Sequence, residues 1–142
     1  MTLTTIDETD LRILNMLLDN SALAHKEIGA LVHLTGQAVG ARIRKLQELG
    51  VIEGYTLRWN PDKLGLTVHA LVTVFMKSGA AHSAFQAFAL RRSEILEAHR
   101  IGGEGCYWLR VRVDSQAALN ALLDELLHYG NYKISLSIGR IK

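Results

Sequence analysis

The chain has little of the residues on which several common protein classes depend, and each shortage excludes one of those classes. Cys106 is the only cysteine among 142 residues, so no disulfide can form within the chain and a reducing cytoplasm is the expected compartment. One cysteine and six scattered histidines do not provide the closely spaced ligands of a zinc site. We therefore expect a protein that needs neither a metal nor a cofactor.

Long apolar runs are also absent. No run approaches the roughly 20 residues that cross a bilayer, although hydrophobic residues make up 49% of the chain, enough for an apolar core. The first ten residues, MTLTTIDETD, are polar and acidic, which does not fit a signal peptide. The net charge of +2 is too small to indicate a nucleic-acid partner by itself. These features predict a soluble intracellular protein with no membrane partner.

The pattern of apolar residues changes along the chain, which indicates two domains over residues 1–60 and 61–142. The first domain begins with a helix that Asp7 can cap. Its core face is expected to be a row of leucines, with Ile13 and Leu17 beside them. The leucines of that row are Leu11, Leu14 and Leu18. The segment VIEGYTLRWNP, near the end of this domain, is expected to be a short strand or a hinge.

A second helix, expected over residues 24–32, is separated from a third helix by a very short turn. Thr35 can cap the third helix, which leaves only His33 and Leu34 to make the turn. A turn this tight usually needs a residue in the left-handed conformation, and His33 is expected to adopt it. The inward residues of the second helix are expected to be Ile28, Leu31 and Val32. This spacing is typical of a helix-turn-helix.

The third helix has its apolar residues on one side. Val39, Ile43 and Leu46 are spaced i, i+4 and i+7 and should form its core face, and Gly50 is placed to end the helix. In helix-turn-helix proteins the corresponding helix lies in the major groove of DNA. The segment therefore predicts binding to double-stranded DNA, with an ordinary solvent-exposed amphipathic helix as the alternative interpretation.

The N-terminal half of this third helix would enter the groove. The residues able to reach base edges are Gln37, Gly40, Ala41 and Arg44. Glutamine suits adenine, arginine suits guanine, and alanine can pack against a thymine methyl group. Backbone phosphates would be contacted from the flanks of the helix and from its start. The residues expected at phosphates are Thr35, Arg42 and Lys45.

From Thr67 onward, strands and helices alternate. Strands are expected over residues 68–76, 95–101, 106–113 and 133–141, and helices over residues 81–92 and after Ser115. This order is the split βαβ arrangement, with both helices on one face of an antiparallel sheet. The other face would expose Trp108 beside arginines, and an exposed apolar surface indicates a partner. We expect Trp108 in an oligomer interface, with a sheet surface that binds single strands or RNA as the alternative.

Three segments of the chain match a known pattern: IDETDLRILNMLLDNS, KEIGALVHLT and VGARIRKLQELGVIEGYTLRWNPDKLG. They resemble the Lrp/AsnC (leucine-responsive regulator and asparagine regulator) family of transcription factors. The resemblance implies an α+β protein with a winged-type helix-turn-helix domain, a hinge strand and a βαββαβ ferredoxin-like domain. It also implies a transcriptional regulator that dimerises sheet to sheet, assembles into octamers and bends or wraps DNA.

The resemblance further implies that an amino-acid effector binds at the glycine loop. Gly102, Gly103 and Glu104 match this loop, but Cys106 stands where many members carry an aspartate that pairs with the amine of the effector. A neutral thiol cannot form that ion pair. An effector-independent or differently specific member is therefore expected at least as much as one with the usual amino-acid response. Taken without the resemblance, the loop is a hairpin turn that needs positive φ angles.

Catalysis has little support in the sequence, and we expect no enzyme activity. Cys106 with His99 and His128 could form a nucleophilic site, but no local signature surrounds the cysteine and a buried structural thiol fits better. The alternative function is a regulatory, small-molecule-sensing subunit of an enzyme, because βαββαβ domains also serve as sensors. The helix-turn-helix argues for DNA binding, since such a subunit has no need of it.

Overall fold

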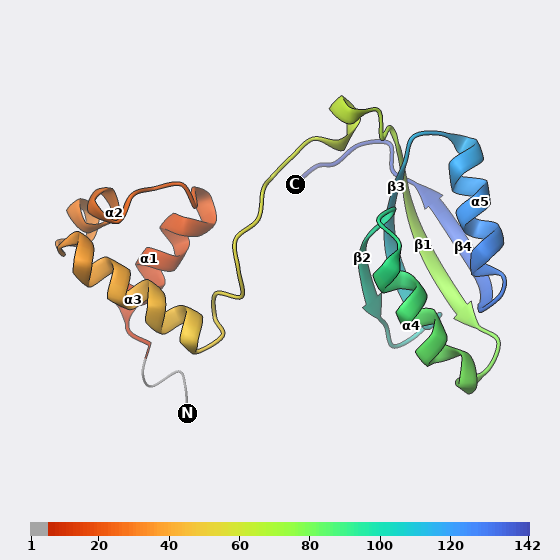
Figure 1. The fold of residues 1–142 in the computed structure, drawn as a ribbon, viewed down its shortest axis with the longest axis horizontal. Helices are drawn as coiled ribbons and strands as arrows, with labels where there is room; N and C mark the ends of the chain where they lie inside the picture. The colour runs from red at the N-terminus through yellow and green to blue at the C-terminus, as the bar shows by residue number, and fades with distance from the viewer. Residues whose placement is uncertain (1–5) are drawn as a thin grey trace. The chain divides into compact units, whose positions relative to one another are not determined.

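The computed structural model describes residues 6–142, and its contacts divide the chain into two units between Arg58 and Trp59. The first unit is helical, and the second combines helices with a sheet (Figure 1). Residues 1–5, part of the segment whose polarity argued against a signal peptide, lie outside the described residues. Every helix within residues 6–142 is too short or too polar to span a bilayer.

Three helices make up the first unit: α1 (Glu8–Asp19), α2 (His25–Val32) and α3 (Gly36–Glu48). Asp7 caps α1 as predicted, because its side chain accepts a hydrogen bond from the Asp10 N–H while the Asp10 carboxylate accepts one from the Asp7 N–H. The predicted core stripe of α3 is confirmed. The core of the unit consists of Ile13, Leu17, Ile28, Val32, Val39 and Ile43.

The inner faces of α1 and α2 differ from the prediction. Leu11 and Leu18 are 49% and 74% exposed, and Leu31 is 59% exposed, so these three leucines are not core residues. Asp10 takes a place on the inner side of α1 and is completely buried there. A pattern based on apolar residues alone places an aspartate outside, and this shifted the predicted core face of α1.

The turn between α2 and α3 is as tight as predicted. His33 adopts the left-handed conformation, with φ 59° and ψ 44°, and the Thr35 side chain caps α3 by accepting a hydrogen bond from the Ala38 N–H. The Leu34 N–H donates to the Gly29 carbonyl oxygen over 2.9 Å. A Cβ on Gly29 would lie 2.3 Å from the Leu34 carbonyl oxygen, so the turn requires glycine at this position.

An extended segment, Val51 to Asn60, follows α3. Gly50, with φ 76°, ends the helix as predicted. Within the described residues this segment pairs with no strand. Of the two forms expected here, a short strand or a hinge, the structure shows the hinge. Its large exposed apolar side chains are Val51, Tyr55, Leu57 and Trp59. A short 3-10 helix, η2 (Pro61–Leu64), comes next.

The second unit is built on a four-stranded antiparallel sheet. Its strands are β1 (Val68–Met76), β2 (Ile95–Arg100), β3 (Tyr107–Val113) and β4 (Gly130–Leu136), in the spatial order β2-β3-β1-β4. The helices α4 (His82–Arg91), which follows the short η3 (Gly79–Ala81), and α5 (Gln116–Leu126) lie on one face of the sheet (Figure 1). This order and this layering confirm the ferredoxin-like arrangement.

Alternate residues of β3 face the helices, as predicted. Tyr107, Leu109, Val111 and Val113 are buried, whereas the residues between them are only half-buried. They pack against β1, the phenylalanines of α4 and the leucines of α5. Ser115 caps α5, as expected, by accepting a hydrogen bond from the helix backbone. The core of this unit therefore lies on the helix side, which leaves the other face of the sheet uncovered within the unit.

The last strand differs from the prediction in its bounds. It begins at Gly130 instead of Lys133 and ends at Leu136 instead of Ile141. Gly130 was expected to stop the preceding helix, but it lies within the ladder between β4 and β1. A Cβ on Gly130 would lie 2.0 Å from the Phe75 carbonyl oxygen, so the close strand contact requires glycine.

Candidate nucleic-acid interface

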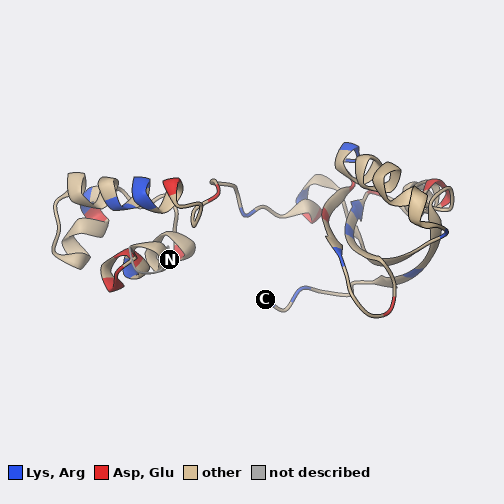
Figure 2. Cartoon of the chain, turned by 90° about the horizontal axis from the view of Figure 1, so that it is seen from below, with Lys and Arg blue, Asp and Glu red and all other residues tan. Residues whose placement is uncertain are grey.

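The outer side of α3 is an exposed polar surface. Gln37, Ala41 and Arg44 are exposed, while the apolar stripe on the opposite side holds the helix in the core. The basic positions of the first unit are concentrated on α3 (Figure 2). Among residues 6–142, no carboxylate forms an ion pair with Arg44. Its guanidinium can therefore bind an external acceptor.

Thr35 lies at the start of α3 and is exposed. Its hydroxyl oxygen accepts a hydrogen bond from the Ala38 N–H over 3.1 Å. The hydroxyl proton can still be donated to an acceptor outside the protein. A phosphate contact through Thr35 is compatible with this geometry and stays a prediction.

Arg42 and Lys45, which we expected at phosphates, are instead bound to carboxylates of α1 and its cap. Arg42 Nη1 lies 2.7 Å from Asp7 Oδ1 and 3.0 Å from Asp10 Oδ1, and Lys45 forms an ion pair with Asp10. A buried carboxylate without such partners would be costly, and Asp10 is fully buried. These ion pairs assign both cations a role in the stability of the unit, and their predicted contacts with phosphates stay a prediction.

These contacts change the acidity of both carboxyl groups. The Arg42 guanidinium, together with the Asp10 N–H, lowers the pKa of Asp7 to about 2. Burial raises the pKa of Asp10, but the hydrogen bonds from Lys45, from the Asp7 N–H and from Arg42 outweigh it, so the pKa of Asp10 is lowered overall. Both carboxylates are therefore ionised at neutral pH and keep the two cations engaged.

A shallow hollow opens on the exposed side of α3. Its lining includes Gln37, Gly40, Arg44 and Gln47 from α3 and His25 from the first residue of α2. Gly40, predicted to reach a base edge, is half-buried, because the His25 ring lies against it. His25 was not among the predicted residues of this surface, because the periodicity of one helix does not show which residue of another helix covers it.

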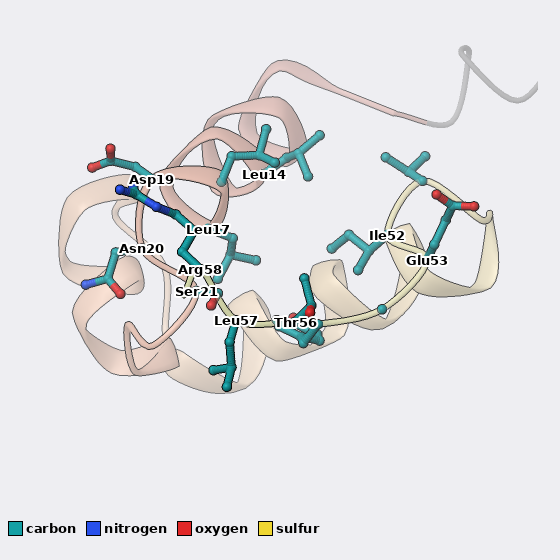
Figure 3. Close-up of a pocket in the computed structure, with 14 residues that line it drawn as sticks. Leu14, Leu17, Asp19, Asn20, Ser21, Ile52, Glu53, Thr56, Leu57 and Arg58 are labelled. Atoms are coloured by element: carbon teal, nitrogen blue, oxygen red, sulfur yellow. The ribbon is translucent and has the colours of Figure 1, made fainter. Parts of the chain in front are cut away.

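A second hollow, of about 470 Å³, lies between the C-terminal half of α1 and the segment 51–58 (Figure 3). Leu14, Leu17 and Ile52 line it, together with the exposed Leu18 and Leu57. The row of leucines on α1 is the sequence feature that marks this hollow. We interpreted that row as a core face buried within the chain. An apolar groove beside an unpaired extended segment is typical of a surface that a partner covers.

The glycine loop of the second unit has the backbone that its sequence requires. Gly103 and Gly105 have φ angles of 98° and 91°, which confirms the expected positive φ. Lys133 Nζ lies 2.5 Å from Glu104 Oε1, and this contact lowers the pKa of Glu104. Cys106 is half-buried, and its N–H donates to a carbonyl oxygen of β1. The carboxylate of the loop therefore already has a cationic partner within the protein.

Trp108 lies on the open face of the sheet, as predicted. It is half-buried beside His99, with 5.8 Å between the two ring centroids. On the same face, Arg110 pairs with Glu97 and Arg112 pairs with a carboxylate of η2. Because these arginines have internal partners, they are less available to the phosphates of a single strand than the sequence alone indicated.

The contacts around Cys106 do not assemble a nucleophilic site. His99 bonds to Glu97, and the His128 ring bonds to the backbone carbonyl of Glu125. Within the part of the chain that the structure describes, no group of three His, Cys, Asp or Glu side chains could hold a metal ion.

The two units together define a class of protein, a transcriptional regulator with a helix-turn-helix for DNA and a separate domain for a ligand. Residues 6–53 match the winged helix-turn-helix DNA-binding family, and residues 69–142 match the Lrp/AsnC ligand binding domain. The chain belongs to the Lrp/AsnC family of transcriptional regulators.

Individual relatives agree with this assignment. The chain is 44% identical to the HTH-type transcriptional regulator LrpB of Bacillus subtilis over 137 residues, 96% of this chain and 91% of that protein. It is 32% identical to the leucine-responsive regulatory protein of Salmonella typhimurium, over 86% of this chain and 76% of that protein. These relatives are transcriptional regulators, and the predicted function class is confirmed.

Solved structures show the same fold. The structure of Bacillus subtilis LrpC is similar with a TM-score of 0.90 and 28% identity, over 96% of this chain and 97% of that chain. A transcriptional regulator from Neisseria meningitidis, in complex with L-Met, has a TM-score of 0.90 and 26% identity, over 96% and 92% of the two chains. The predicted fold class is thereby confirmed.

Proposed function

We propose that this regulator binds double-stranded DNA through the outer side of α3, with Gln37, Ala41 and Arg44 at the base edges. The observation that carries the proposal is the exposed polar stripe on a helix whose other side is held in the core. A helix supported in this way presents its side chains at defined positions, which the reading of base edges requires. The protein acts in the cytoplasm by binding, without an enzymatic activity of its own.

The functional form is a homodimer or a higher even-numbered oligomer such as an octamer. Three surfaces support this proposal: the open sheet face with Trp108, the unpaired segment with Tyr55 and Leu57, and the apolar groove beside it. Pairing would place two α3 helices on half-sites roughly 34 Å apart or a multiple of that distance. A higher assembly would bend or wrap the DNA, with the bending energy offset by additional backbone contacts.

The second unit senses a small effector of the amino-acid class. The similar Neisseria meningitidis regulator was solved with L-Met, which supports this class of ligand. In this chain Glu104 is bound to Lys133, and position 106 carries a thiol where many members carry a carboxylate, so the amine of an amino acid lacks its usual partner. An effector is therefore held through the backbone of Gly102 and Gly103, with a specificity that differs from members that carry an aspartate.

The deciding experiment selects duplexes from a random pool with the full-length protein and footprints the best-bound sequence. Binding is then titrated with salt and repeated with each free amino acid. We expect salt-dependent binding and protection that recurs about every helical turn, with affinity or footprint changed by a subset of the amino acids.

The alternative, a sensor subunit without DNA binding, makes the opposite prediction. It expects no enrichment of any duplex and no retention of DNA at low salt, while amino acids still raise the thermal stability of the protein. That combination of results would replace the DNA-binding proposal with the sensor.

A further inference from the structure

The exposed side of α3 includes a side chain that comes from α2. A Cβ on Gly40 would lie 3.0 Å from His25 Nδ1 and 3.3 Å from His25 Cε1. These distances are shorter than ordinary van der Waals contact, so the imidazole occupies the space into which a side chain at position 40 would extend. Both residues line the hollow that also contains Gln37 and Arg44.

Gly40 holds a central position on this surface. It lies three residues after Gln37 and four before Arg44, so the three positions share one side of the helix. Glycine is a poor residue for a helix interior, and no turn or positive φ requires it here. The contact with His25 gives a reason for the glycine, because a Cβ here would require the exposed ring to shift by a few tenths of an ångström.

The His25 ring is available to an external acceptor. The residue is exposed, and within residues 6–142 no protein group forms a hydrogen bond with its ring. In a helix-turn-helix the helix that precedes the recognition helix crosses the DNA backbone, and phosphate oxygens accept hydrogen bonds from side-chain N–H groups.

We propose that His25 is a DNA-contacting residue whose imidazole N–H donates a hydrogen bond to a backbone phosphate beside the groove that α3 enters. Gly40 leaves room for the ring in this place. This proposal rests on the proposed binding of DNA through α3. It implies that His25 and Gly40 do not contribute independently to the affinity for DNA.

A double-mutant cycle tests this coupling. Dissociation constants are measured by fluorescence anisotropy for the wild type, His25→Ala, Gly40→Ala and the double variant. Each protein is tested on a duplex selected by the wild type from a random pool and on a shuffled duplex of the same composition. Asn15→Ala, at an exposed position of α1, is the control variant, and Arg44→Ala tests the proposed function independently.

His25→Ala is expected to weaken binding to both duplexes by about fivefold, the effect of one lost hydrogen bond. Gly40→Ala is expected to weaken binding by a similar factor although alanine stabilises the helix, and a thermal melt should show an unchanged or raised midpoint. In the His25→Ala background, Gly40→Ala should cause no further loss. A stable variant with weaker binding and this non-additivity supports the proposal.

Four outcomes would overturn it. They are an unchanged affinity in His25→Ala, losses that multiply in the double variant, a loss confined to the selected duplex, and a Gly40→Ala variant that binds as well as the wild type. If Arg44→Ala weakens binding while His25→Ala does not, only this inference fails. If the wild type retains no duplex at low salt, the proposed function fails and this inference fails with it.

Discussion

At the scale of single residues, Asp10 holds two of the cations of α3 in ion pairs within the protein. Its carboxylate is completely buried and receives Arg42, Lys45 and the Asp7 N–H. Removing a carboxylate from water is unfavourable unless charged partners compensate for the lost hydration. Two of the three basic residues on α3 are used in this way, and Arg44 is the one that remains directed away from the core.

This assignment predicts different effects for the arginines of α3. Arg44→Ala should weaken binding to a selected duplex about tenfold, because a good arginine contact with a base contributes roughly 1–3 kcal/mol, and the thermal stability should not change. The measurement is a titration by anisotropy alongside a thermal melt. The matched control is Arg91→Ala, which removes an exposed arginine of α4. An Arg44→Ala variant that binds as tightly as the control would contradict its place in the groove.

Asp10→Asn should lower the free energy of unfolding of the first unit by about 2 kcal/mol. The loss is expected to be smaller than the roughly 3–5 kcal/mol for a fully buried pair, because Arg42 and Lys45 are still partly exposed and solvent screens them. Urea unfolding followed by circular dichroism measures it. Glu8→Gln, an exposed acid of the same helix, is the control. Equal stability of the two variants would contradict the role of Asp10.

The same cluster predicts a dependence on pH. The pKa of Asp7 is lowered from 3.8 to about 2 in the folded protein. A lowered pKa contributes stability that is fully present above the ordinary value and is lost as the pH falls through the folded value. The first unit should therefore lose stability between about pH 4 and pH 2. An Arg42→Ala variant should lose less stability over this pH range. Thermal melts recorded at a series of pH values measure the difference.

At the scale of elements, the turn between α2 and α3 positions the recognition helix. Gly29 approaches the Leu34 carbonyl oxygen so closely that a methyl group cannot fit, and His33 accepts the left-handed conformation. The Thr35 cap then begins α3 directly after the turn. Together these contacts hold α3 against α2 and bring His25 over Gly40.

Gly29→Ala should destabilise the first unit by about 2 kcal/mol, in the range of an overpacked core, because the obstacle is backbone. It should also weaken DNA binding by displacing α3. Chemical unfolding and anisotropy measure the two effects. Gly54→Ala is the control, since a Cβ there meets no atom within 4 Å among the described residues. Similar stability of the two variants would show that the turn tolerates a side chain.

At the scale of the whole molecule, surfaces left open within each unit indicate an assembly. Within residues 6–142, the sheet of the second unit has helices on only one face, and the first unit has an apolar groove beside an extended segment that pairs with no strand. An open apolar surface of this kind supports the proposed association with a second copy of the chain, because most soluble oligomers are symmetric assemblies of one chain.

Trp108→Arg should lower the number of subunits in the assembly, because a buried charge replaces an apolar anchor at the centre of the proposed interface. Light scattering coupled to size exclusion should show a lower mass, and DNA affinity should fall with it. Leu90→Arg, which places an arginine at an exposed position of α4, is the control. An unchanged mass for Trp108→Arg would place the interface elsewhere.

Local patterns were enough to predict most of the elements. The caps Asp7, Thr35 and Ser115, the stripe of α3 and the alternation of β3 are encoded in neighbouring residues, so they could be identified without coordinates. The bounds of β4 were wrong, because the glycine that looked like a stop is required by an adjacent strand. Propensity is local, whereas the space available to a side chain is not.

The predictions for the DNA-binding surface differ in the same way. Gln37, Ala41 and Arg44 are exposed as helical spacing predicts. Two further features depend on contacts between residues of different helices. They are the ion pairs of Arg42 and Lys45 with Asp10 and the position of the His25 ring against Gly40. Charge and periodicity identified which side of α3 is polar, but they did not show which of its cations were already paired.

The sequence by itself determined the class of fold, the family and which side of the third helix is exposed and polar. These follow from periodic apolar residues, caps and a characteristic run of residues, which are all short-range features of the chain. Only the tertiary structure decided that the Asp10 carboxylate is buried and that two cations of α3 pair with it. It also decided that the His25 ring lies against Gly40, where that helix has no side chain. Those decisions depend on which surfaces meet when helices pack, because burial and ion pairing are set by neighbours in space.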